Sequence, residues 1–226
     1  MKYTILGKSN STISIILENL YSQYNENFSI NIIKNMEDTS ILPYAIDNIK
    51  INEFDHDNFD YDINLTNYIL GGTQVETKKC IFYFFNKKYN INETNYCNII
   101  PKHVVISKTV IFKNGFVINC GCVIAPYVNI GKFVTINRNS SIGHHTVIGD
   151  FVTINPGTNI AGNCYIGDDT TIGIGVTIID GITIGKKCFI GAGSVVTKNI
   201  SDNVIAYGVP CKIIRENNHE NINIVD

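Results

Sequence analysis

The sequence lacks the features that mark several large classes of protein. Its net charge is −2 and only 17% of its residues are charged, so it offers no strongly basic surface for nucleic acid. The longest apolar run, residues 80–85, is far shorter than the ~20 residues that cross a bilayer. The first residues contain no apolar signal segment. We therefore expect a cytoplasmic protein of one or two domains, without a membrane span.

The cysteines also lack a pattern typical of disulfides or of metal sites. The seven cysteines are scattered, their number is odd, and no C-x-x-C pair occurs. This pattern argues against a disulfide framework and against a cysteine zinc site. Cys122, Cys164 and Cys188 fall on small inward positions of the repeat described next, so we predict that they fill a core.

A six-residue repeat dominates the chain from residue 104 onward. Sixteen consecutive positions at this spacing carry a large apolar side chain, without insertion: Ile106, Phe112, Ile118, Ile124, Ile130, Ile136, Ile142, Ile148, Ile154, Ile160, Ile166, Ile172, Ile178, Ile184, Ile190 and Val196. Two residues before most of them lies another small or aliphatic side chain, which predicts a short strand with two inward positions. Glycine or asparagine often follows directly, and we expect it to take the left-handed backbone of a tight corner. The pattern predicts a parallel β-helix over residues 99–214.

The first 98 residues alternate between predicted strands and helices. Strands are expected at 2–7, 28–33 and 66–72, and helices at 11–24 and 73–88. This order predicts a small α/β, Rossmann-like domain over residues 1–98.

Two segments fit neither pattern. The Asp- and Asn-rich stretch 35–62 has no assignment. The polar segment 215–226 is predicted to be a frayed C-terminal tail.

The segment "ILGKSNST" joins the first predicted strand to the first predicted helix. It places Gly7, Ser9, Asn10 and Ser11 where free backbone N–H groups and the helix dipole form an anion site. A nucleotide-hydrolysing P-loop is excluded, because the glycine it needs five residues earlier would fall at Lys2. Diphosphate binding and a simple turn with a helix cap both fit these residues.

The repeat resembles that of the hexapeptide-repeat acyltransferases. In this family the chain winds as a left-handed triangular prism with three hexads per coil, so sixteen hexads imply about five coils. The α/β domain ahead of the prism is similar to that of nucleotide-sugar N-acetyltransferases, including those of the bacillosamine pathway, and of sialic-acid O-acetyltransferases. Their first loop commonly reads G-x-S-G-H-G and holds the nucleotide sugar. Gly7 and Ser9 match this motif, whereas Asn10, Ser11 and Thr12 replace its other residues.

The resemblance also implies an activity and partners. It implies an enzyme that uses acetyl-CoA to acetylate the amino group of a nucleotide-linked amino-dideoxy sugar for surface glycans such as lipopolysaccharide or capsule. The family further implies a homotrimer with active sites between subunits. O-acetylation of a sialic-acid-like sugar and a catalytically inactive β-helical scaffold are the alternatives.

Two adjacent histidines are the candidate catalytic residues. His144 and His145 follow Gly143 at a predicted corner and should point away from the interior, where a solvated polar role is one interpretation. With 18 residues per coil, Gly162 stacks on His144 at ~4.8 Å and leaves its backbone N–H near the imidazole. Acyl transfer needs such a base and such an oxyanion donor. The resemblance implies these roles for His144 and Gly162, and implies that Asn137 lines the site.

The sequence departs from the family at two positions near His144. His145 stands where the family usually has Asp or Glu, which would orient the base. Thr153 replaces a histidine found in some relatives. A zinc site needs a third ligand, and His103 lies 41 residues before His144, which is not a whole number of coils. We therefore expect no metal.

The last coils are the candidate acetyl-CoA site. By resemblance, the pantetheine runs beside a "G-A-G-S-V-V" coil and the adenine meets a "G-x-P-A-K"-like segment. The residues that match are Gly173, Gly175, Gly191, Ala192, Gly193, Val209, Pro210 and Lys212. Lys198, Lys212 and Arg215 supply positive charge for phosphates. A purely structural role of the glycines at corners is the alternative.

Overall fold

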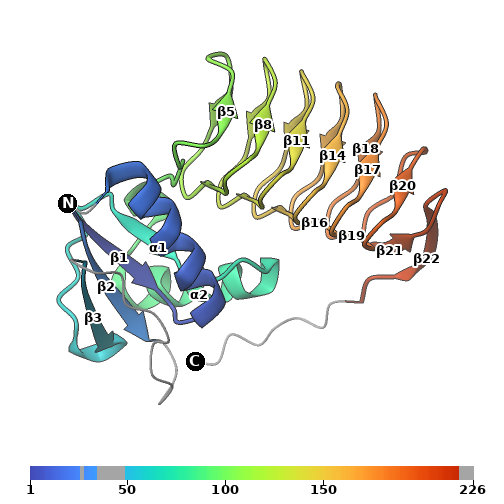
Figure 1. The fold of residues 1–226 in the computed structure, drawn as a ribbon. Coiled ribbons are helices and arrows are strands. Elements are labelled where there is room, and N and C mark those ends of the chain that lie inside the picture. Colours follow the sequence, from blue (N-terminus) through green and yellow to red (C-terminus); the bar gives the residue numbers. More distant parts are fainter. Residues whose placement is uncertain (26–27, 35–48, 219–226) are drawn as a thin grey trace.

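The computed structural model describes residues 1–25, 28–34 and 49–218. A small α/β part is followed by a long parallel β-helix (Figure 1). Residues 35–48 of the unassigned stretch, and residues 219–226 of the expected tail, lie outside the described residues.

The α/β part is a four-stranded parallel sheet with strand order β3-β2-β1-β4. Its elements are β1 (Lys2–Leu6), α1 (Asn10–Tyr24), β2 (Ser29–Lys34), β3 (Lys50–Asp55), the 3₁₀ turn η1 (His56–Asn58), β4 (Tyr68–Leu70), α2 (Val75–Tyr89) and the 3₁₀ turn η2 (Glu93–Asn95). The three predicted strands and both helices are confirmed. Strand β3 was not predicted, because it has no apolar alternation and only its β2 side is paired.

The β-helix is built from sixteen two-residue strands. They are β5 (Val105–Ile106), β6 (Ile111–Phe112), β7 (Val117–Ile118), β8 (Val123–Ile124), β9 (Asn129–Ile130), β10 (Thr135–Ile136), β11 (Ser141–Ile142), β12 (Val147–Ile148), β13 (Thr153–Ile154), β14 (Asn159–Ile160), β15 (Tyr165–Ile166), β16 (Thr171–Ile172), β17 (Thr177–Ile178), β18 (Thr183–Ile184), β19 (Phe189–Ile190) and β20 (Val195–Val196). The second residue of each strand is one of the sixteen repeat positions, so that prediction is confirmed.

Every third strand belongs to the same sheet. The three parallel sheets have the orders β20-β17-β14-β11-β8-β5, β18-β15-β12-β9-β6 and β21-β19-β16-β13-β10-β7. Stacked residues are therefore 18 apart, as in the pairs Ile142↔Ile160 and Ile148↔Ile166. The predicted prism of about five coils is confirmed.

A short antiparallel pair closes the last coil. Strand β21 (Val204–Tyr207) joins the third sheet and pairs with β22 (Lys212–Glu216). Arg215 and Glu216, expected in the frayed tail, therefore lie in a strand. Ladder hydrogen bonds to β21 order these two residues.

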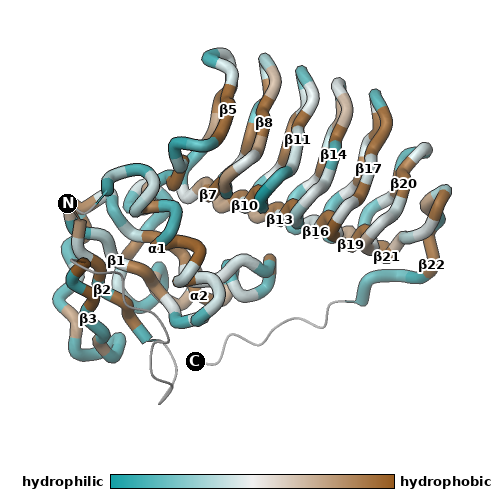
Figure 2. Tube along the Cα trace, in the orientation of Figure 1, coloured by the Kyte–Doolittle hydropathy of each residue, from teal (hydrophilic) through white to brown (hydrophobic). Residues whose placement is uncertain are grey.

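The interior of the prism is apolar and closely packed. Phe116, Cys122, Cys164 and Cys188 are at most 2% exposed, and burial raises the pKa of the three thiols above its ordinary value. The prediction that these cysteines fill the core is confirmed. Figure 2 shows the hydrophobic residues recurring along the strands of the β-helix.

The prediction that the glycines directly after the inward isoleucines take the left-handed backbone of the corner was wrong. Positive φ angles occur three residues after the inward isoleucine, as at His145 (57°) and Gly175 (65°), whereas Gly143, directly after one, has no positive φ. A Cβ atom on Gly143 would lie 2.3 Å from the carbonyl carbon of Ala161 in the next coil. Glycine is needed at that position because neighbouring coils approach closely.

The α/β part docks on the sheet that contains β7, β10 and β13. Lys78 of α2 is fully buried there and donates to the carbonyl oxygens of Phe133 (2.7 Å) and Val152 (3.1 Å). Thr153 donates to the Thr73 carbonyl at 2.7 Å. These contacts couple the two parts into one molecule.

Candidate active site

The two histidines lie in the corner between β11 and β12. Both side chains are exposed, which confirms that they point away from the core. Hydrogen bonds fix the backbone on both sides of the corner: His145 N donates to the Pro126 carbonyl at 3.1 Å, and the His144 carbonyl accepts from Asn163 N at 2.8 Å. The histidines therefore stand on backbone tied to the coils before and after them.

The two imidazoles contact each other directly. Their Nδ1 atoms are 3.1 Å apart and the rings meet edge to face, 5.3 Å between centroids at 83°. His145 also stacks on Tyr127, with centroids 4.9 Å apart. One Nδ1 must donate its hydrogen while the other accepts it. When His144 is the donor, its second nitrogen, Nε2, keeps a free lone pair and can act as a base.

Gly162 lies under the ring of His144. A Cβ atom on Gly162 would be 2.6 Å from His144 Cε1 and 2.7 Å from Nε2, which confirms the predicted stacking. Within the described part of the chain, no group accepts a hydrogen bond from the Gly162 amide. The glycine thus makes room for the imidazole and leaves a backbone donor beside it.

Asp180 belongs to this site and was not predicted. It lies two coils after His144 in the same column, and its Oδ1 would be 2.9 Å from a Cβ atom on Gly162. Asn163 Nδ2 holds its carboxylate, at 3.3 Å from Oδ1 and 3.5 Å from Oδ2. The spacing of 36 residues, two full coils, was the signal in the sequence that could have located it.

Asn137 lies in a different corner, between β10 and β11. It is 6% exposed and belongs to a buried amide ladder in which Asn19 of α1 donates to Asn119, and Asn119 donates to Asn137 at 2.9 Å. Its own amide donates to the Ile154 carbonyl at 3.1 Å. Among the described residues, no hydrogen bond joins Asn137 to either histidine. The structure therefore gives Asn137 a docking contact rather than a contact with His144.

The loop after β1 has the expected strand-turn-helix geometry. Gly7 adopts a φ of 85°, and Ser9 is the N-cap residue of α1 but makes no side-chain capping bond. The Ser9 hydroxyl instead accepts from Thr12 Oγ1 at 3.2 Å and lies 3.5 Å from that of Ser11. Asn10 begins the helix. Within the described residues no hydrogen bond or ion pair links this loop to His144.

Four of the candidate acetyl-CoA residues are glycines, and these fall into two groups. Gly173 and Gly191 resemble Gly143, since a Cβ on either would come within 2.6 Å of the next coil. Gly175 and Gly193 have positive φ and no atom within 4 Å of such a Cβ. These two leave open space along the surface of the prism.

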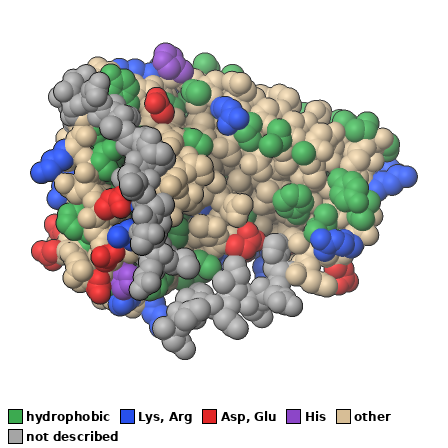
Figure 3. Space-filling model, turned by 60° about the horizontal axis from the view of Figure 1, so that its bottom comes forward, with side chains coloured by type: hydrophobic (Ala, Val, Ile, Leu, Met, Phe, Trp, Pro, Cys, Tyr) green, Lys and Arg blue, Asp and Glu red, His purple; other side chains and the backbone are tan. Residues whose placement is uncertain are grey.

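The remaining candidates lie at the C-terminal end. Ala192 is exposed at its corner, and Lys198, Val209, Pro210 and Lys212 are exposed on the last coil and the closing hairpin. Figure 3 shows hydrophobic and basic side chains exposed together at this end of the molecule. Such a surface can contact both the apolar and the phosphate parts of one ligand.

The described residues contain no group of three or more His, Cys, Asp or Glu side chains arranged to hold a metal ion. None of the described helices is both long enough and apolar enough to cross a membrane.

The repeat region matches a known family model. Residues 145–178 and 163–198 match the bacterial transferase hexapeptide (six repeats). No curated protein sequence is significantly similar to the chain.

Several solved structures share the fold. The acetyltransferase domain of PglB from Neisseria gonorrhoeae, in complex with acetyl coenzyme A, is 19% identical, with a TM-score of 0.74 over 94% of this chain and 98% of that one. A mutant perosamine N-acetyltransferase from Caulobacter crescentus, in complex with CoA and GDP-perosamine, is 21% identical, with a TM-score of 0.72 over 95% and 97%. WeeI from Acinetobacter baumannii is 20% identical, with a TM-score of 0.75 over 95% and 100%. The chain thus carries bacterial transferase hexapeptide repeats within a two-part fold that it shares with the PglB acetyltransferase domain, perosamine N-acetyltransferase and WeeI.

Proposed function

We propose that the protein is an acetyl-CoA-dependent N-acetyltransferase that acts on the amino group of a nucleotide-linked amino-dideoxy sugar in surface-glycan biosynthesis. The observation that carries this proposal is the exposed imidazole of His144, bonded through Nδ1 and facing the Gly162 backbone through Nε2. The similar folds solved with acetyl coenzyme A, and with CoA and GDP-perosamine, support it.

The residues of the corner supply the chemistry of acyl transfer. His144 Nε2 takes a proton from the amine as the amine nitrogen attacks the thioester carbon of acetyl-CoA. The Gly162 amide donates to the carbonyl oxygen while negative charge develops on it. The carbon–nitrogen bond forms, the carbon–sulfur bond breaks, and the imidazolium returns the proton to the CoA sulfur. The products are an amide and free CoA.

His145 takes the place of the orienting acid that the family usually has. In the tautomer that this mechanism needs, its Nδ1 accepts from His144 Nδ1 at 3.1 Å, while stacking on Tyr127 fixes its own ring. An accepting imidazole sets the tautomer of His144, but it carries no negative charge to stabilise the imidazolium. His145 therefore orients the base through this hydrogen bond alone.

The two ligands would occupy the surfaces described above. The open surface at Gly175 and Gly193 fits a pantetheine chain, because no side chain fills it. Lys198 and Lys212 would contact the phosphates of CoA. The backbone amide groups that follow Gly7, at the start of α1, would bind the diphosphate of the sugar nucleotide. The Gly7 amide itself donates to the Ile33 carbonyl at 2.9 Å, so Gly7 would contribute the turn and not a donor.

Turnover with a panel of acceptors tests the proposal. Purified protein is mixed with acetyl-CoA and with uridine, thymidine and guanosine diphosphate amino sugars, and thiol release and product mass are followed. We expect acetylation of an amine. Turnover only on sialic acids would favour O-acetylation, and no turnover on any acceptor would favour a scaffold.

The histidine variants test the mechanism. His144→Ala should lose roughly 10²–10⁴ in kcat because the base is removed, with the KM for acetyl-CoA nearly unchanged. His145→Ala should lose less, because the base itself remains. The roles are reversed if His145→Ala abolishes turnover while His144→Ala stays active.

A further inference from the structure

Asp180 and His144 converge on the space above Gly162. A Cβ atom on Gly162 would be 2.7 Å from His144 Nε2 and 2.9 Å from Asp180 Oδ1. The nitrogen and the oxygen are therefore no farther apart than these two distances combined. A small polar group bound over Gly162 would be within hydrogen-bonding reach of the base and of the carboxylate at once.

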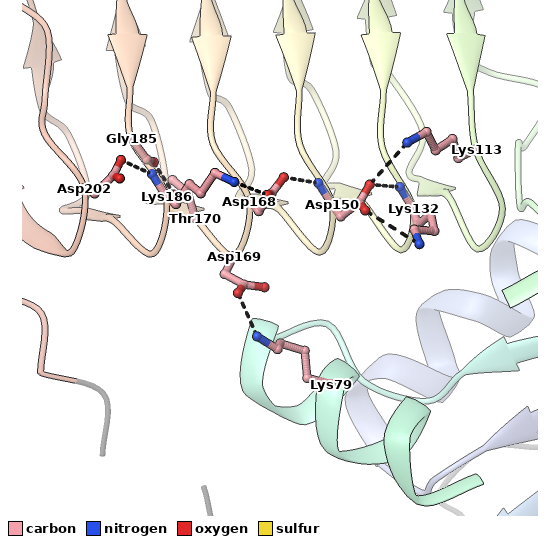
Figure 4. A network of polar contacts seen from close by, with 10 residues as sticks. All are labelled: Lys79, Lys113, Lys132, Asp150, Asp168, Asp169, Thr170, Gly185, Lys186 and Asp202. Carbon is pink, nitrogen blue, oxygen red and sulfur yellow. Dashed lines mark hydrogen bonds and ion pairs between the residues drawn. The ribbon is translucent and has the colours of Figure 1, made fainter. Parts of the chain in front are cut away.

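Asp180 differs from the aspartates of the neighbouring corner. Asp150 and Asp168 occupy the same position in their hexads (Figure 4). Asp150 accepts from Lys132 N at 2.9 Å and lies 3.8 Å from the Lys132 amine, and Asp168 accepts from Asp150 N at 3.0 Å and pairs with Lys186 at 2.9 Å. Asp180 pairs with no lysine or arginine among the described residues. Asp180 is thus exposed and, within the described part of the chain, has no lysine or arginine partner of the kind that Asp150 and Asp168 have.

Asn163 holds this carboxylate in position. Its side-chain amide donates to both oxygens of Asp180, and its backbone N donates to the His144 carbonyl. One residue thus links the base and the carboxylate to the same corner. The direction of the Asp180 side chain is set by a specific contact, not by solvent alone.

We propose that Asp180 binds the acceptor as an ammonium ion and thereby selects an amine over a hydroxyl. This inference rests on the proposed acetyltransferase function. A carboxylate forms short, charge-assisted hydrogen bonds with an ammonium group, whereas a hydroxyl acceptor brings no positive charge. Asp180 therefore favours binding of amino sugars at neutral pH.

The proposed role is consistent with the proton balance of the reaction. The bound ammonium gives one proton to His144 Nε2, which releases it to water. The amine then attacks the thioester carbon, Nε2 takes the second proton, and the CoA sulfur receives that proton as the carbon–sulfur bond breaks. Asp180 stays ionised throughout and holds the nitrogen beside the base.

The test compares Asp180→Asn with Asp202→Asn, an exposed aspartate that accepts a backbone N–H at another corner. Both variants are assayed with the amino sugar nucleotide that the wild type acetylates and with its hydroxyl counterpart. We expect Asp180→Asn to raise the KM for the amine at least tenfold, with the KM for acetyl-CoA unchanged. The defect should shrink at a pH where the acceptor amine is neutral. Asp202→Asn should match the wild type.

The outcomes separate this inference from the proposed function. If the wild type acetylates an amine but Asp180→Asn and Asp202→Asn have equal KM values, Asp180 only stabilises its corner and the inference is wrong. If the wild type acetylates no amine, the proposed function fails, and the inference with it. Should Asp180→Asn not fold, Asn163→Gly, which suits the positive φ of 56° and frees the carboxylate, must raise the same KM. An unchanged KM in that variant would also overturn the inference.

Discussion

At the scale of single residues, the corners contain two kinds of glycine that a sequence pattern does not distinguish. Gly143 has no positive φ. A Cβ atom added to it would lie 2.3 Å from the carbonyl carbon of Ala161. Gly175 has a φ of 65° and free space around it. Replacement of Gly143 is restricted by the contact between coils, whereas replacement of Gly175 is restricted only by its backbone conformation.

We expect these two glycines to respond differently to alanine. Gly175→Ala should cost about 1–2 kcal/mol of unfolding free energy, the penalty for a left-handed residue. Gly143→Ala should cost clearly more, because the added methyl group must push two coils apart. Urea unfolding followed by circular dichroism measures both. A smaller loss for Gly143→Ala than for Gly175→Ala would contradict this explanation.

The residues that could be predicted are those fixed by the repeat. The inward positions follow from the strict six-residue repeat. The stacking of His144 on Gly162 follows from the 18 residues in each coil. The left-handed conformation at this place in each hexad could not be predicted, because bulky aromatic residues such as Tyr127 and Phe133, which rarely adopt positive φ, share it with His145. Asp180 was missed because aspartates are common at corners, although its spacing of two full coils from His144 places it in the histidine column. Its lack of a lysine or arginine partner among the described residues is visible only in the structure.

At the scale of elements, helix α2 docks on the β-helix through a buried amine. Burial lowers the pKa of Lys78 from an ordinary 10.5 to about 7, while the negative charges of Asp169 and Glu76 act in the opposite direction. Its amine donates to the carbonyl oxygens of Phe133 and Val152. The contact between helix and prism is therefore sensitive to the protonation of one side chain.

This contact predicts a pH dependence of stability. Between pH 7 and pH 10.5 the unfolded chain keeps the proton on Lys78 and the folded chain does not, so the free energy of unfolding rises with pH. The wild type should gain up to about 1.4 kcal/mol per pH unit relative to Lys78→Met. Urea titrations at pH 7, 8 and 9 measure the difference. Lys102→Met, an exposed control, should show no such difference from the wild type.

The helices and strands of the α/β part were predicted except for β3, and neither 3₁₀ turn was predicted. Two helices and three strands have apolar faces that the sequence displays. Strand β3 does not, since it pairs only with β2 in the described part of the chain and its side chains are partly buried or exposed without a regular alternation. Its place in the sheet depends on pairing with β2, which no local pattern specifies.

At the scale of the whole molecule, two faces of the first coils carry exposed apolar side chains. The outward residues Val105, Ile111 and Val123 are 65%, 66% and 46% exposed. They lie on the two sheets other than the one that carries the Lys78 and Thr153 contacts with the α/β part. Neighbouring apolar side chains on such faces are typical of surfaces that bury each other on association.

We therefore predict a homotrimer in which these faces pack together. Light scattering at micromolar concentration should give about three times the chain mass of 25.2 kDa. Val123→Lys should weaken assembly, because it places a charge in the interface, whereas Thr177→Lys on the same sheet but nearer the C-terminal end should have less effect. A wild-type mass of one chain would contradict the prediction.

The hydrogen bonds between coils have a consequence for how the site can change. Gly143, Asn163 and Gly181 each donate a backbone N–H to a neighbouring coil, so the histidine corner is held at a fixed pitch. Except at glycines such as Gly162, where an added Cβ would lie 2.6 Å from the imidazole, a substitution on a neighbouring coil changes which atoms face His144, while these hydrogen bonds keep the spacing of the coils. The backbone of the prism therefore sets the spacing within the site, and the side chains set its chemistry. We expect that single substitutions at these stacked positions can change which acceptor molecule the site binds, without a change in loop conformation or a new hinge.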